Sequence, residues 1–240
     1  MVSLFGRRER NVDLPRVRPR ARGGNQNVNR VSLGELTPDP KPFLGRAAYV
    51  QLSLFNAAAH AVATAPHTRG KNALSRVARL SLQKYEGLVA ELIRLGHDPS
   101  IAMQPYESDT DRYQRAVVGK DWYEALVTCY VTAGLLDDFF VRLSGGLSDD
   151  ENNRISALLA PDTASQYIVV ELRTAIEESP RLASRLALWG RRLVGDTLLM
   201  ARAALVVPDN TAPDEARLEP VFTEMIAAHT RRMDALGLTA

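Results

Sequence analysis

The chain has 240 residues, of which 45% are hydrophobic and 24% are charged, an ordinary composition for a globular protein. No run of about 18 apolar residues occurs, so no membrane-spanning helix is expected. The arginines near the N-terminus precede no apolar segment typical of a secretory signal. Cys129 is the sole cysteine, which excludes an intramolecular disulfide and a thiolate metal cluster. These features predict a cytoplasmic protein without membrane contact.

Residues 1–40 are rich in arginine, proline, glycine and asparagine and have almost no apolar pattern. The first thirty residues hold eight arginines against Glu9 and Asp13, a net charge of +6, whereas the whole chain carries +2. Such a segment buries too little surface to offset its ordering entropy, so we predict a disordered basic arm. Arginine binds phosphate and carboxylate in bidentate fashion, which favours contact with RNA or an acidic protein, and a solubilising tail is the alternative. The arginines that would make such contacts are Arg7, Arg8, Arg10, Arg16, Arg18, Arg20 and Arg22.

Residues 41–240 have helical periodicity throughout and are predicted to form one domain. Prolines and glycines divide this part into helices near 42–65, 72–96, 119–144, 149–178, 181–206 and 214–236. Pro161 either kinks the fourth helix or marks a true start at Asp162. The long connection 97–118 between the second and third helices is what a ferritin-like four-helix bundle requires, because its second and third helices run parallel. The predicted fold class is therefore all-α, a ferritin-like bundle with two additional C-terminal helices.

A ferritin-like bundle commonly holds two metal ions between its helices. That site needs one carboxylate from each of two helices and a Glu-x-x-His motif from each of the other two. The sequence contains no Glu-x-x-His. Its four histidines fall in predicted loops or near helix ends, where surface or boundary positions are expected: His60, His67, His97 and His229.

Three stretches carry a family resemblance: KDWYEALVTCYVTAGLLDDFFVRLS (120–144), RLALWGRRLVGDTLLMARAAL (185–205) and AHTRRMDALGL (228–238). They resemble actinobacterial ferritin-like proteins related to the tRNA 2-methylthio-isopentenyladenosine hydroxylase, and the likeness covers residues 42–238. The resemblance implies an oxygen-dependent enzyme with two irons. When the family's metal-ligand positions are aligned with this sequence, however, most of them hold residues that do not bind metal. These degenerate metal-site positions are Gln51, Ser81, Lys84, Ala133, Asp162 and Ser165.

Lys84 and Ser81 lie on or beside the apolar face of the second predicted helix, which raises the question of what the ammonium contacts. It either pairs with a residual acid, Asp162 or Asp138, or extends along its apolar stem to the bundle edge, and we favour the second arrangement. Asp137 and Asp138 are adjacent on a helix, so one is expected to face inward and the other outward.

Three functions from different classes follow. The first is a ferritin-like protein that has lost its metal site and acts without a cofactor as a binding or scaffolding partner. Its partner would be RNA or an active ferritin-like relative in a mixed dimer. The second is a di-iron tRNA hydroxylase-like oxygenase, as the resemblance taken whole implies. The third is a structural homo-oligomer. The missing imidazoles favour the first.

Overall fold

The computed structural model describes residues 33–160, 162–205 and 214–240, and these residues form helices and no strands. The elements in chain order are η1 (Leu33–Leu36), α1 (Pro40–Thr64), α2 (Thr68–Arg94), α3 (Pro99–Met103), η2 (Gln104–Tyr106), α4 (Glu107–Ala116), α5 (Trp122–Leu143), η3 (Ser144–Gly146), α6 (Asp149–Leu159), α7 (Ser165–Glu178), α8 (Pro180–Arg202) and α9 (Asp214–Ala235). The predicted all-α fold class is confirmed.

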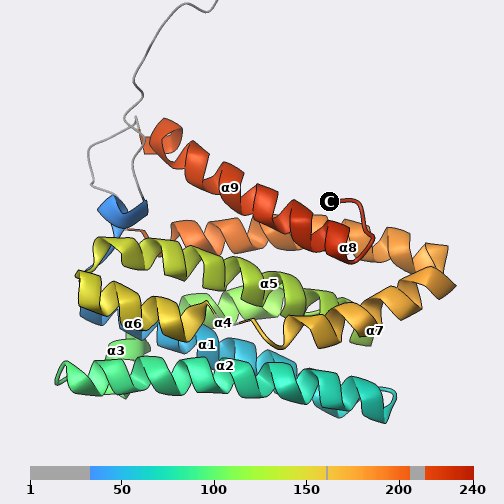
Figure 1. Cartoon of the computed structure of the whole chain (residues 1–240), viewed down its shortest axis with the longest axis horizontal. Coiled ribbons are helices and arrows are strands. Elements are labelled where there is room, and N and C mark those ends of the chain that lie inside the picture. Colours follow the sequence, from blue (N-terminus) through green and yellow to red (C-terminus); the bar gives the residue numbers. More distant parts are fainter. Residues whose placement is uncertain (1–32, 161, 206–213) are drawn as a thin grey trace, which may run out of the picture.

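The central bundle consists of α1, α2, α5 and the consecutive pair α6 and α7 (Figure 1). Helices α1 and α2 form an antiparallel hairpin, and α2 and α5 run in the same direction and end at the same side of the molecule (Figure 1). Helices α6 and α7 return along the bundle beside α2 and α5. Helix α8 packs against α5, and α9 lies across α5 and α8. This order is the topology that the long connection predicted.

Local sequence signals explain where the helices begin. The Asp121 carboxylate accepts a hydrogen bond from the Glu124 N–H at 3.0 Å and so caps α5. A capping box of Ser148 and Glu151 starts α6. The predicted helix 149–178 is in fact two helices, because α6 ends at Leu159 and α7 starts at Ser165. A proline within this interval cannot donate a helical hydrogen bond, so a true break forms there rather than a kink.

The crossover between α2 and α5 contains two short helices, α3 and α4, that were not predicted. Helix α3 packs closely on α1 at Gly45, where a Cβ atom would overlap the Ala102 carbonyl group. The crossover is therefore part of the packed structure, and only glycine fits at this contact.

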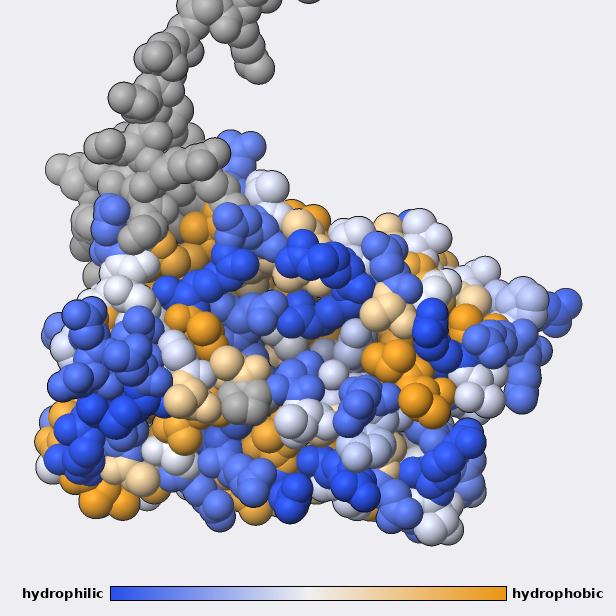
Figure 2. Space-filling view, in the orientation of Figure 1, coloured by the Kyte–Doolittle hydropathy of each residue, from blue (hydrophilic) through white to orange (hydrophobic). Residues whose placement is uncertain are grey.

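The core lies between the bundle helices and is built from their apolar faces. Phe43 of α1 and Phe140 of α5 contact each other edge to face, with ring centroids 5.8 Å apart. Both rings are almost completely buried. The face seen in Figure 2 is largely hydrophilic, and its apolar areas are separated from one another. In the described ranges, no helix combines the length and the apolar character needed to cross a membrane.

The described residues just before α1 also pack on the bundle. Leu33 and Leu36 of η1 are buried, and the Thr37 hydroxyl donates a hydrogen bond to the Leu143 carbonyl at the end of α5. Residues 33–40, which the sequence analysis assigned to the arm, therefore pack on the bundle. The remainder of the arm, with its seven candidate contact arginines, lies outside the described residues.

Candidate functional site: an ion pair at the bundle centre

The degenerate metal-site positions come together at one small cavity of the bundle, with Asp162 at its exposed edge. Gln51 on α1 and Ser81 and Lys84 on α2 are all buried. A cavity of about 30 Å³, large enough for one water molecule, lies beside them. The degenerate positions that line it are Ser81, Lys84, Ala133, Asp162 and Ser165.

The Lys84 ammonium forms a buried ion pair with Asp137 of α5. Lys84 Nζ lies 2.5 Å from Asp137 Oδ2, and the two side chains are 4% and 13% exposed. Gln51 Nε2 donates to the other carboxylate oxygen at 2.7 Å. The expectation that Lys84 reaches solvent at the bundle edge is therefore wrong, and so is its pairing with Asp162 or Asp138. Burial makes an unpaired ammonium so costly that a carboxylate on the facing helix must accompany it.

The electrostatics of this pair are set by its burial. Desolvation raises the pKa of Asp137 above its usual range, and the Lys84 ammonium and the Gln51 amide act in the opposite direction. Gln51 Nε2 must face the carboxylate, because the amide oxygen would be repelled there. This orientation leaves Gln51 Oε1 buried without a hydrogen-bond partner among the described residues.

The two residual acids named in the sequence analysis have other roles. Asp138 points outward, as predicted for one of the adjacent aspartates, and accepts a hydrogen bond from Arg232 of α9 at 2.7 Å. The same guanidinium donates to the Gly134 carbonyl at 2.9 Å. Asp162 is exposed and accepts from the Ser165 N–H at 3.2 Å, which places it at the start of α7. Neither acid contacts Lys84.

The side chains around the cavity do not fit a di-metal centre. Two carboxylates, Asp137 and Asp162, line it, and the other polar groups are an ammonium, a thiol and hydroxyls. An ammonium has no lone pair to offer a metal ion, and it already occupies one oxygen of Asp137. In the part of the chain that the structure describes, no three His, Cys, Asp or Glu side chains are grouped so as to hold a metal ion.

The histidines lie apart from the ion pair, and one of them differs from its predicted placement. His60 and His67 are exposed and His97 is partly exposed, as expected. His229 is only 2% exposed, and neither of its ring nitrogens has a hydrogen-bond partner among the described residues. Its burial and the nearby Arg232 charge lower its pKa to about 4. The spacing of Met225, His229 and Met233 puts all three on one face of α9, a signal that could have predicted this burial.

The family resemblance puts the third-helix metal-site position at Ala133, whereas the side chain that meets Lys84 belongs to Asp137. Both residues line the cavity, and they lie one helical turn apart on the same face of α5. The sequence does not fix how far α5 is shifted along α2, so it predicts that one of Asp137 and Asp138 faces inward but not that Asp137 meets Lys84.

Comparison with protein families agrees with the fold. The family model of the actinomycete ferritin-like domain matches residues 41–214. A comparison with curated proteins finds no match for the chain. The matched segment includes all the helices of the central bundle and the residues of the Lys84 ion pair. The chain therefore belongs to the ferritin-like domain family of actinomycetes.

Proposed function

We propose that this chain is a non-catalytic ferritin-like protein, in which an internal ion pair has replaced the di-metal site and which acts as a binding or scaffolding partner. The contact between Lys84 Nζ and Asp137 at the bundle centre carries the proposal. A buried ammonium repels a metal ion beside it and takes the carboxylate that the ion would need. The alternative, a di-iron oxygenase resembling the tRNA hydroxylases, needs imidazole ligands that the cavity wall does not provide.

Metal content tests this proposal. We expect the full chain, purified from its native host, to contain well below one iron or manganese per chain by elemental analysis. Incubation with ferrous iron or manganese, followed by desalting, is expected to leave this ratio unchanged. A ratio near two metals per chain in either preparation would contradict the proposal and favour the oxygenase.

The arm suggests RNA as the first partner to test. All of the positively charged side chains in residues 1–40 are arginines, and arginine-rich segments commonly order on RNA. We expect removal of residues 1–30 to leave the melting temperature unchanged and to weaken the retention of single-stranded RNA.

A matched control keeps the length of the arm and replaces Arg7, Arg8, Arg10, Arg16, Arg18, Arg20 and Arg22 with glutamine. Because each lost phosphate contact reduces the slope of log affinity against log salt by about 0.7, both variants should show a flatter salt dependence than the full chain. Equal RNA binding by all three proteins would exclude the arm as the contact.

A further inference from the structure

A second cavity lies nearer the start of α5 than the ion pair does, and Cys129 lines both cavities. Its volume is about 330 Å³, within the range of small-molecule sites, and it opens between the C-terminal half of α1, the loop 117–121 and the start of α5. We propose that this cavity binds a small, neutral, largely apolar molecule that carries a carbonyl or ether oxygen. The inference does not rest on the loss of the metal site, because the Lys84 ion pair does not line this cavity.

Small side chains make up much of the cavity wall. Ala57 and Ala61 of α1 and Ala125 of α5 all line it, and their short methyl groups leave space between the helices. Protein interiors are normally packed to the density of organic crystals, so a space of this size offers room that a ligand can fill. Val118 is 65% exposed at the mouth and extends the apolar wall toward solvent. An apolar ligand would contact these walls and fill the space between them.

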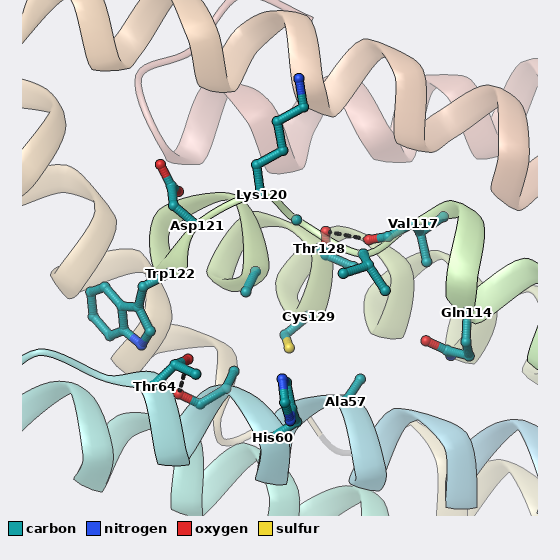
Figure 3. A pocket seen from close by; sticks show the side chains of 14 residues that line it. Ala57, His60, Thr64, Gln114, Val117, Lys120, Asp121, Trp122, Thr128 and Cys129 are labelled. Carbon is teal, nitrogen blue, oxygen red and sulfur yellow. Dashed lines mark hydrogen bonds between the residues drawn. The ribbon is translucent and has the colours of Figure 1, made fainter.

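The polar groups in the wall define the chemistry of the ligand. Trp122 is 8% exposed, and its indole N–H has no hydrogen-bond acceptor among the described residues. Gln114 Nε2 is likewise buried without a partner. Figure 3 shows these two side chains at opposite ends of the cavity, with His60 and Cys129 facing each other between them. Because an indole N–H can only donate, the ligand must bring an acceptor oxygen.

The charges around the cavity favour a neutral ligand. Lys120 points away from the centre of the cavity (Figure 3). The Asp121 carboxylate forms an ion pair with Arg185 and caps α5. Burial raises the pKa of the Cys129 thiol to about 12, so this part of the wall is uncharged at neutral pH. Of the residues that line the cavity, neither Lys120 nor Asp121 is therefore directed into the space between His60 and Cys129.

Prodan, a fluorescent naphthalene with a ketone oxygen, is a probe with these properties. We expect the full chain to bind one prodan per chain, with a blue shift of its emission. Ala57→Leu fills the cavity and should weaken binding about tenfold or more. Ala63→Leu adds the same side chain on the exposed face of α1 and should leave binding unchanged.

The hydrogen bond is tested separately with Trp122→Phe. This variant should weaken prodan binding about fivefold to tenfold, the usual effect of losing one hydrogen bond. It should not change the binding of dimethylaminonaphthalene, which lacks the ketone. If Ala57→Leu binds prodan as well as the parent chain does, the probe lies elsewhere and the site is refuted. If Trp122→Phe weakens both probes equally, the proposed acceptor role is wrong.

Discussion

Lys84→Met is expected to lower the free energy of unfolding by roughly 3–5 kcal/mol, the usual cost of leaving a buried charge without its partner. The variant retains the volume of the side chain but removes the ammonium that Asp137 contacts at 2.5 Å. Gln51 alone then faces the carboxylate. Urea unfolding followed by circular dichroism measures the loss.

A double-mutant cycle separates the interaction energy of Lys84 with Asp137 from the other effects of replacing Lys84. Lys84→Met combined with Asp137→Leu should recover most of the lost stability, because an apolar pair fills the same space without a desolvated charge. The control cycle pairs Lys84→Met with Asp162→Asn and should show much weaker coupling, since Asp162 lines the same cavity but makes its hydrogen bond to the start of α7. Additive losses in the Asp137 cycle would refute the ion pair.

The pH dependence of Lys84→Met gives an independent measurement. Without the ammonium, burial still raises the pKa of Asp137 in the folded state above its value in the unfolded chain. A carboxyl group with a raised folded pKa stabilises the protein at pH values below its unfolded pKa, and this contribution is lost as pH rises. The deficit of Lys84→Met against the parent chain should therefore shrink as the solution is acidified. A constant deficit would contradict this account.

His229 is expected to make the protein lose roughly 3 kcal/mol of stability on acidification. Its pKa is about 4 in the folded chain, against a usual value of 6.5. The unfolded chain therefore binds a proton at a pH where the folded chain does not. Full stability is present above pH 6.5 and declines as pH falls from there toward 4. Thermal unfolding between pH 4 and 8 measures this decline.

His229→Leu should remove this part of the pH dependence. At pH 8 the variant should be as stable as the parent chain or more stable, because both buried ring nitrogens lack partners among the described residues. His97→Gln serves as the control, since His97 is partly exposed and should leave the profile unchanged. The same decline in His229→Leu as in the parent chain would assign the effect to other groups.

The periodicity of apolar residues was sufficient to predict the long helices, because each has 22 or more residues and buries one face. The same signal missed α3 and α4, which are short and lie within a stretch punctuated by prolines. It also joined α6 and α7, since both flanks of Pro161 have helical patterns and a proline alone does not distinguish a kink from a break.

The sequence predicted one residue of the central ion pair but not its partner. The position of Lys84 on the apolar face of α2 predicted an unusual ammonium, and its burial follows from that face. Its partner depends on how α2 and α5 are aligned along their axes, which is a property of the packed bundle and not of either helix. Ala133 and Asp137 fit the periodicity of α5 equally well, so the pattern of one helix could not choose between them.

A lysine at the centre of the bundle is part of the chain as the ribosome makes it, whereas a metal ion has to bind after synthesis. If the Lys84–Asp137 ion pair has replaced the metal site, as we propose, the chain reaches its native state without a loading step, and its folding yield should not follow the iron or manganese supply of the cell. Chelators act on proteins that bind metal in the folded state, so the proposed function predicts that a chelator leaves the stability of this chain unchanged. Such a bundle would keep its shape through metal starvation.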